Sequence, residues 1–593
     1  MKKLKLLFLF LLPSLPFLAY ADKVEIHDIY YNLDGENKTA EVTSCPSGIK
    51  YSGNITIPNQ VSYGDVTYNV TSIGNQAFYY CKELIKVSIP NSVTTLGTGA
   101  FSGCSGLTNV TIPNSVTTIG DGAFSGCSNL SSINIPNSVT AIGSSAFNTC
   151  TSLTSVIIPN SVTSIGEWAF YGCSALEGVI LSNSITKINK ETFSGCSSLK
   201  SIHIPNGVTY LGNAAFDKCG GLTEFIIPES VTGLGNYVFR DCTGLTSMVL
   251  PNSLKSTGGS GVFWGCTNLS SVTIPNSVTH ISGYSFVGCH SLKSLTIPSS
   301  VTWIDEYAFQ NSGLTSIVIP NSVRHVSDHV FLNCSALESI YIGSGVSILG
   351  SNYSSNCAFD GCDALTSIVV DSENETFDSR NNCNAIINTE SNVLIAGCKS
   401  TIIPEDITVI GSYAFLGIRN LQSIVIPNNV TAIGYQAFYN CSGLKSIVIP
   451  NQVTDIDNFA FYGCSSLESV TIGHSVTKIQ SEAFWGCKNL TSVTSLNSTP
   501  PQLSTSGVFS STTEKTAILY VPEGSDGAYR EADRWKNFLD IRTIPYTGVQ
   551  TVERELLVPA SIYTLDGKQL KDHDTSTLPK GFYVIDGKTV YVK

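Results

Sequence analysis

The chain contains few charged residues. Asp, Glu, Lys and Arg make up only 13% of its 593 residues, whereas globular proteins carry about 25%, and the 42% apolar content excludes a disordered polyelectrolyte. Positive charge is the scarcer sign, because 33 Lys and Arg face 45 Asp and Glu, for a formal charge of −12. The basic surface that attracts a phosphate backbone is therefore missing, and we expect no nucleic-acid partner.

Long hydrophobic runs are absent beyond the N-terminus. Residues 1–21 read MKKLKLLFLFLLPSLPFLAYA, with three lysines, an apolar run broken by Pro13 and Pro16, and small residues at the end. A membrane-spanning helix needs about 20 unbroken apolar residues, whereas this pattern is typical of a secretory signal peptide. We expect cleavage before Asp22 and a secreted or cell-surface protein.

Catalytic motifs are missing as well. The sequence has no HExxH zinc motif, no Walker A loop and no GxSxG elbow between a strand and a helix. Its eight histidines show no ligand or triad spacing, and its carboxylates are scattered. We therefore expect a protein that is not an enzyme, with no catalytic residue, no metal site and no cofactor.

What the sequence does contain is a repeat of 23 residues. One unit, residues 153–175, reads LTSVIIPNSVTSIGEWAFYGCSA, in which apolar residues alternate along a short strand that Pro159 ends. A second extended segment includes Ile165, and the residues around Phe170 have spacings suited to a tight helical turn. Seventeen phenylalanines mark the repeat: Phe78, Phe101, Phe124, Phe147, Phe170, Phe193, Phe216, Phe239, Phe263, Phe286, Phe309, Phe331, Phe359, Phe415, Phe438, Phe461 and Phe484.

Each unit offers roughly eight apolar side chains that it cannot bury alone, so neighbouring units must stack. We expect residues 71–497 to form a solenoid of about 17 units, interrupted near residues 371–403 by a hairpin island that projects from or replaces one coil. Residues 22–70 fit an N-terminal β cap. Residues 498–546 fit a C-terminal cap with a strand and a helix that begins after Ser525.

The repeated unit resembles the leucine-rich repeat of the BspA-like class of bacterial surface proteins, through LTSVIIPNSVTSIGEWAFYGC and its sixteen relatives. The resemblance implies a leucine-rich-repeat solenoid of 23-residue units, with short parallel strands plus helical turns and small β-rich caps at both ends. Several members of that class are adhesins. The partners it implies are a host extracellular-matrix or cell-surface protein or glycan, or other bacterial surfaces.

Residues 549–593 form a separate β-rich segment. Its Asp566-Gly567 and Asp586-Gly587 pairs lie between β-branched runs, a strong hairpin signal. The pieces IYTLDGKQL, LPKGFYVIDGK and TVYVK resemble the C-terminal sorting domain of Bacteroidota proteins exported by type IX secretion. That resemblance implies the export machinery as a partner and the exterior of the outer membrane as the location. The alternative is a plain β-rich end cap.

The cysteines follow the repeat. Side chains stacked at about 4.8 Å are poor disulfide partners, so we expect buried thiols that act as small hydrophobic residues. Whether Cys383 and Cys398 form a disulfide across the island hairpin is open, and Cys45 and Cys357 are unassigned. Fifteen of the 19 cysteines lie three residues after a repeat phenylalanine: 81, 104, 127, 150, 173, 196, 219, 242, 266, 289, 334, 362, 441, 464 and 487.

Outward-facing positions carry the candidate binding residues. Just before the second isoleucine of each unit most coils have Thr, Ser or Ala, but three consecutive coils have His280, Trp303 and His325, and two others have Tyr210 and Lys187. Aromatic residues with polar tips anchor interfaces. We therefore expect an adhesin-like binding protein in which these five residues contact the ligand. The alternatives are rings that only cover backbone, and a spacer solenoid without a ligand. A second aromatic series flanks the repeat phenylalanines: Trp168, Tyr171, Tyr237, Trp264, Tyr284, Tyr307, Tyr413, Tyr435, Tyr439, Tyr462 and Trp485.

Overall fold

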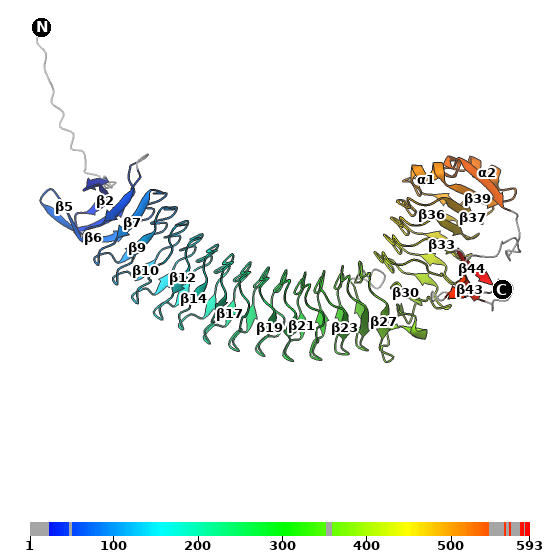
Figure 1. The fold of residues 1–593 in the computed structure, drawn as a ribbon, viewed down its shortest axis with the longest axis horizontal. Helices are drawn as coiled ribbons and strands as arrows, with labels where there is room; N and C mark the ends of the chain where they lie inside the picture. The colour runs from blue at the N-terminus through cyan, green and yellow to red at the C-terminus, as the bar shows by residue number, and fades with distance from the viewer. Residues whose placement is uncertain are drawn as a thin grey trace, which may run out of the picture. The chain divides into compact units, whose positions relative to one another are not determined.

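A computed structural model describes residues 23–46, 50–350 and 358–544, together with the backbone of four short strands between 562 and 592. The signal peptide expected at residues 1–21 and Cys357 lie outside the described residues. Contacts divide the chain after Cys196 into two compact units. In Figure 1 each unit is a row of stacked coils with short strands and very little helix.

The first unit starts with antiparallel strands and continues as parallel coils. Its strands are β1 (Val24–Ile26), β2 (Ile29–Asp34), β3 (Thr39–Thr43), β4 (Gly53–Thr56), β5 (Gln60–Tyr63), β6 (Val66–Ile73), β7 (Leu84–Ser88), β8 (Thr95–Leu96), β9 (Asn109–Thr111), β10 (Thr118–Ile119), β11 (Ala141–Ile142), β12 (Ser155–Ile157), β13 (Ser164–Ile165), β14 (Gly178–Ile180) and β15 (Lys187–Ile188). Strands β1, β2 and β3 pair antiparallel, as do β5 and β6. From β6 onward β8, β10, β11 and β13 add in parallel, so one sheet joins the N-terminal strands to the coils.

The second unit repeats the coil pattern. Its first elements are β16 (Ser201–Ile202), β17 (Tyr210–Leu211), β18 (Gly233–Leu234), β19 (Ser247–Val249), β20 (Ser271–Thr273), β21 (His280–Ile281), β22 (Trp303–Ile304), β23 (Ser316–Ile319), β24 (His325–Val326), β25 (Ser339–Ile342), β26 (Ile348–Leu349), β27 (Ser367–Val370), β28 (Phe377–Asp378), the 3-10 turn η1 (Arg380–Asn382), β29 (Ile386–Asn388) and β30 (Val393–Ala396). The first and second strands of the coils form separate parallel sheets, such as β23-β25-β27 and β21-β22-β24-β26.

The C-terminal part of this unit begins with coil strands and ends in a cap of strands and short helices. It comprises β31 (Val409–Ile410), β32 (Ala432–Ile433), β33 (Ser446–Ile449), β34 (Asp455–Ile456), β35 (Ser469–Ile472), β36 (Lys478–Ile479), β37 (Ser492–Ser495), β38 (Gln502–Leu503), α1 (Ser511–Thr516), β39 (Ile518–Pro522), α2 (Asp526–Glu531), η2 (Trp535–Asn537) and β40 (Asp540–Ile544). The helix expected after Ser525 is only six residues long. Ala532 adopts an extended conformation that ends it, and Trp535 lies in the following turn η2.

Alternation explains the first strand of each coil. In β12 and the residue after it, Val156 and Ile158 are 2% exposed while Ile157 between them is 63% exposed, as the two-residue period of a strand requires. Pro159 follows directly and ends the strand. The parallel register β12 to β14 then places Val156 beside Val179, so equivalent residues of successive coils share one interior.

The phenylalanine side of the described coils consists of the expected tight turns, which do not continue into a helix. The backbone N–H groups of Trp168, Phe170 and Gly172 donate to carbonyl oxygens of the next coil at 3.0, 2.9 and 2.7 Å, so they are not used within a helix. Trp168 and Gly172 have φ of 56° and 69°, a left-handed conformation that interrupts a right-handed helix. Single turns remain, because the Cys173 N–H donates to the Phe170 carbonyl at 3.3 Å, and the spacing did not reveal the hydrogen bonds between coils that keep these turns from forming a helix.

The repeat phenylalanines form the core, as expected. Those described are at most 4% exposed, and neighbouring rings stack with centroids 4.9 to 5.9 Å apart and nearly parallel planes. Tilted rings cover the ends of the columns: Tyr51 packs on Phe78 at 4.7 Å, and Phe538 packs edge-on against Phe509 at 5.3 Å. Phe509 belongs to the column because it stacks on Phe484. The 23-residue period did not include Phe509, because Phe509 lies 25 residues after Phe484.

The island around residues 371–403 takes part in the solenoid sheet. Strands β28, β29 and β30 pair antiparallel, and β30 then pairs in parallel with β31. The backbone at Gly397 lies so close to the Phe415 ring that a Cβ there would be 2.2 Å from it. The island therefore covers the next coil and does not project from it.

The last four strands form a sheet of their own. They are β41 (Ile562–Thr564), β42 (Gln569–Leu570), β43 (Gly581–Ile585) and β44 (Lys588–Val592), in the order β42-β41-β43-β44. Ile585 pairs with Lys588 in antiparallel register, so β43 and β44 form a hairpin; the expected Asp-Gly turn residues lie outside the described residues. Among the described residues, no helix has the length and apolar content to cross a membrane.

Candidate functional site

Three of the five expected contact residues lie side by side. His280, Trp303 and His325 begin β21, β22 and β24, and the parallel register pairs His280 with Trp303 and Trp303 with His325. The following residue of each strand, Ile281, Ile304 or Val326, is buried, so alternation turns the aromatic side chain outward. We call these three residues the aromatic column.

The rings of the aromatic column stack on one another. Trp303 and His325 lie 3.9 Å apart between centroids with an interplanar angle of 5°, and His280 lies 6.3 Å from Trp303 at 15°. Trp303 keeps 41% of its surface exposed. Because the stack covers ring faces, a ligand meets mainly ring edges, which carry the N–H groups of the indole and imidazoles.

Carboxylates border the column. His280 Nε2 is 3.3 Å from Asp305 Oδ2. Burial lowers the pKa of His325, and the charges of Asp305 and Asp328 oppose that shift. Nδ1 of His325 is buried, and the described residues offer it no hydrogen-bond partner. Burial thus favours the neutral form of His325, with acidic groups at the edge of the column.

A second ring stack lies on the turns of the same three coils and of the coil before them. Trp264, Tyr284, Tyr307 and His329 stack in sequence with centroids 5.5, 4.9 and 4.9 Å apart. Tyr284, Tyr307 and His329 have φ of 60°, 57° and 57°. Burial and the charge of Glu306 raise the pKa of Tyr284. His329 was not among the residues expected from the sequence, although its position two residues before Phe331 matches that of Tyr307 before Phe309.

The other two expected contact residues are separate from the column. Lys187 lies on β15 of the first unit, whereas Tyr210 lies on β17 of the second. Tyr210 pairs with Gly233 on β18, and a Cβ added at Gly233 would be 3.2 Å from the tyrosine ring. That ring lies over the backbone of the next strand and still keeps 42% of its surface exposed, so Tyr210 stays a candidate contact residue.

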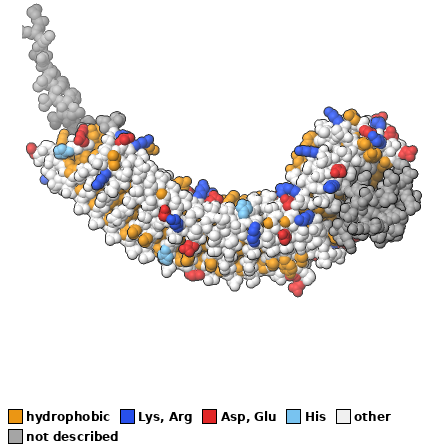
Figure 2. Space-filling model, viewed as in Figure 1, with side chains coloured by type: hydrophobic (Ala, Val, Ile, Leu, Met, Phe, Trp, Pro, Cys, Tyr) orange, Lys and Arg blue, Asp and Glu red, His pale blue; other side chains and the backbone are white. Residues whose placement is uncertain are grey.

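Several rings of the second aromatic series have partners within their own unit. Lys190 Nζ lies 4.8 Å from the Trp168 ring centroid, and the Arg240 guanidinium lies 5.2 Å from that of Tyr237. Tyr439 and Tyr462 stack at 4.9 Å. On the face seen in Figure 2, charged side chains are scattered and form no large patch of one sign.

The cysteine ladder is buried, and no described cysteine forms a disulfide. The thiols are more than small hydrophobic residues, because each typically donates to the carbonyl of the phenylalanine in the preceding coil, as Cys150 does to Phe124 at 3.2 Å. Burial raises the pKa of Cys150 well above its usual range, which leaves the thiol unreactive. Periodicity could not reveal this bond, which depends on the vertical offset between coils.

Cys383 and Cys398 remain thiols as well. Cys383 Sγ donates to Ala385 O at 3.8 Å, and Cys398 Sγ donates to Asn384 O at 3.4 Å. A register shift between Ile386 and Ile387 interrupts the hairpin. The symmetric spacing about the turn therefore does not bring the two sulfur atoms together in a bond.

The described residues contain no group of three or more His, Cys, Asp or Glu placed to hold a metal ion. The aromatic column lacks the paired nucleophile and base that covalent catalysis requires. What the column presents is a set of hydrogen-bonding ring edges on neighbouring strands.

Comparison with known proteins gives one family match. The sequence profile of the BspA type Leucine rich repeat region matches residues 54–177, 169–260, 258–388 and 395–512. No curated protein matches the chain.

Solved structures also match. A leucine-rich repeat protein from Bacteroides ovatus is 27% identical over 79% of this chain and 94% of its own, with a TM-score of 0.36. A leucine rich cell surface protein from Faecalibacterium prausnitzii is 24% identical over 80% and 94%, with a TM-score of 0.32. The pneumococcal vaccine antigen PcpA is 18% identical over 88% and 99%, with a TM-score of 0.28.

Proposed function

This chain belongs to the BspA-type leucine-rich repeat family, and we propose that it is a secreted or surface-displayed binding protein that recognises a protein or glycan along its exposed strands and catalyses no reaction. The partner is a host extracellular-matrix or cell-surface molecule, or another bacterial surface. Export uses the signal peptide at residues 1–21 and the C-terminal module as a type IX sorting domain.

The observation that carries this proposal is the aromatic column. His280, Trp303 and His325 occupy three consecutive strands and stack at 6.3 and 3.9 Å. Strands hold the rings in place before a ligand arrives, which lowers the entropy lost on binding. Their N–H edges suit the carbonyl and hydroxyl oxygens of a protein or a glycan.

Affinity on such a surface is a sum of small contacts. The column offers few donors and no enclosed cavity, so one column alone binds weakly. A long array of coils presents many such contacts on one scaffold, and simultaneous engagement multiplies their effect. The ligand is therefore a polymer or a dense surface and not a free small molecule.

Binding arrays test the proposal. The chain lacking residues 1–21 is applied to matrix-protein and glycan arrays, alongside a variant with serine at positions 280, 303 and 325. The variant should lose most capture because truncating an interface anchor typically costs about 2 kcal/mol or more. Trp485→Ser is a matched control, since Trp485 is 38% exposed, close to the 41% of Trp303, and lies outside the column.

Two results would contradict the proposal. Full capture by the triple variant, with an unchanged melting temperature, would remove the column as the contact surface. The absence of any capture by the native chain would instead favour a spacer protein. The stacking of Trp303 on His325 at 3.9 Å is the specific observation that favours this second function, because the two rings already cover each other's faces without a ligand.

A further inference from the structure

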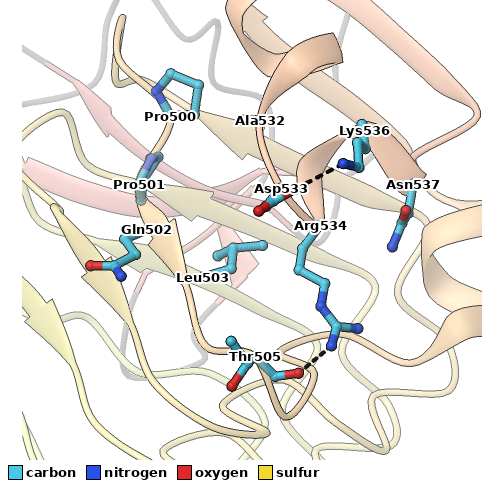
Figure 3. Close-up of a pocket in the computed structure, with 10 residues that line it drawn as sticks. All are labelled: Pro500, Pro501, Gln502, Leu503, Thr505, Ala532, Asp533, Arg534, Lys536 and Asn537. Atoms are coloured by element: carbon cyan, nitrogen blue, oxygen red, sulfur yellow. Dashed lines mark hydrogen bonds and ion pairs between the residues drawn. The ribbon is translucent and has the colours of Figure 1, made fainter.

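The C-terminal cap contains a pocket of ≈ 580 Å³. One wall is the chain around β38, from Pro500 to Thr505, and the other runs from Ala532, at the end of α2, to Asn537 in η2 (Figure 3). None of the five candidate contact residues lines it. The pocket is thus distinct from the strand surface of the proposed function.

Buried contacts hold the two walls together. Trp535 is completely buried, and its indole Nε1 donates to the Pro501 carbonyl at 2.7 Å. The Trp535 ring also packs 5.3 Å from Tyr529 and 5.9 Å from Phe509. The pocket is therefore formed before any ligand binds, which favours affinity.

Arg534 lies across this pocket. In Figure 3 its side chain extends from the η2 wall toward the β38 wall, where Nη2 donates to the Thr505 carbonyl. A guanidinium has five N–H donors, and the described residues provide an acceptor for one of them. The remaining donors include adjacent pairs suited to the two oxygens of a carboxylate.

The backbone at Arg534 is strained. Its φ is 67° and its ψ is −42°, a region that long side chains rarely adopt. Glycine would adopt this conformation more easily than arginine. The backbone conformation therefore does not explain why an arginine occupies position 534. Strain of this kind accumulates at functional sites, where a side chain must be held in a given direction.

The pocket carries one net positive charge. Its lining includes Arg534, Lys536 and Asp533, and Lys536 Nζ binds Asp533 Oδ1 at 2.8 Å, so these two charges offset each other. The neighbouring Glu514 is buried and accepts from Asn537 Nδ2 at 3.1 Å. Asp533 offsets one of the two cations, which leaves one positive charge in the lining of a protein whose formal charge is −12.

The remaining lining is amphipathic. Pro500, Pro501 and Leu503 supply C–H surface, while Gln502 and Thr505 supply an amide and a hydroxyl. A sugar ring has the matching features, a C–H face and several hydroxyl groups. We propose that this pocket binds an acidic sugar residue, with its carboxylate on the guanidinium of Arg534 and its ring against the proline wall.

Ligand-observed NMR on the full chain tests this inference. The probes are methyl glucuronide, methyl glucoside as the neutral match, and a glucoside sulfate as another anion. Saturation transfer should reach methyl glucuronide at millimolar concentration and be at least tenfold weaker for methyl glucoside. Arg534→Gln should weaken glucuronide binding tenfold or more, because charge-assisted hydrogen bonds are about twice as strong as neutral ones.

Two further variants separate binding from folding. Arg542→Gln removes a guanidinium of the same cap that pairs with Asp540 at 2.7 Å and does not line the pocket, so binding should be unchanged. Arg534→Gly relieves the backbone strain and should melt within a few degrees of the native chain while losing glucuronide. Equal transfer to methyl glucoside, preference for the sulfate, or unchanged binding in both Arg534 variants would overturn the proposal. These variants leave His280, Trp303 and His325 untouched, so failure of the pocket does not contradict the proposed function, and capture of acidic glycans on the array is assigned to the pocket only where Arg534→Gln abolishes it.

Discussion

Replacing Phe170 with alanine tests the continuous core directly. Phe170 is completely buried, and its ring stacks on Phe147 at 5.3 Å and on Phe193 at 5.5 Å. A buried Phe→Ala change typically lowers the free energy of unfolding by about 3–5 kcal/mol. We expect the upper half of this range, because the rings on both sides are held by their own coils and cannot collapse into the cavity.

Tyr171→Ala is the matched control. Tyr171 follows Phe170 in the same turn but is 37% exposed and outside the phenylalanine stack, so its loss should cost no more than about 1 kcal/mol. Pairwise stacking adds about 0.5–1.5 kcal/mol beyond burial. The double variant lacking Phe147 and Phe170 should therefore be less destabilised, by about that amount, than the sum of the single variants.

Urea unfolding and hydrogen exchange provide the measurement. A repeat array need not unfold in one step, so exchange read by mass spectrometry should locate the loss of protection in the coils next to Phe170. The reasoning fails if Phe170→Ala costs less than about 2 kcal/mol, or if Tyr171→Ala costs as much.

Three further outcomes follow from the same geometry. In the native protein, iodoacetamide should modify the partly exposed Cys45 before Cys150, whose pKa burial raises, and peptide mass spectrometry would show any early labelling of Cys150. Burial lowers the pKa of His325, so the unfolded chain binds this proton more readily, and stability should fall as the pH drops below about 6.5; the difference in melting temperature between pH 7.5 and pH 5 should shrink in His325→Gln. Glu482 has φ of 53°, so Glu482→Gly should raise the free energy of unfolding by about 1 kcal/mol in urea titrations, and a loss of stability would contradict that reasoning.

In the second ring stack, ring stacking offsets the backbone strain of residues in the left-handed conformation. Tyr307 adopts a left-handed φ of 57°, which costs about 1–2 kcal/mol for an ordinary residue. Its stacking on Tyr284 and His329, at 4.9 Å each, offsets about 0.5–1.5 kcal/mol per pair. Glycine occupies the equivalent position at Gly99 and Gly122, where no ring is needed.

The repeat alone was sufficient to predict that His280, Trp303 and His325 lie on adjacent strands. Residues such as Val156 and Phe170 recur every 23 positions, and apolar positions that recur must be buried against their counterparts, which places the outward positions in columns as well. Ring orientation, the position of His329 and the thiol bonds of the cysteines depend on distances between coils that a period does not contain.

Sequence by itself determined the stacked coils, the inward phenylalanines and the candidate strand surface, because burial of a periodic apolar pattern has one solution. Tertiary structure decided the rest. Hydrogen bonds to the next coil at Trp168 and Gly172 limit the helical turns to single turns, and the non-repeating C-terminal cap brought Thr505 to Arg534. Contacts that depend on distances between coils or on the non-repeating cap leave no period in the sequence, so only the folded chain reveals them.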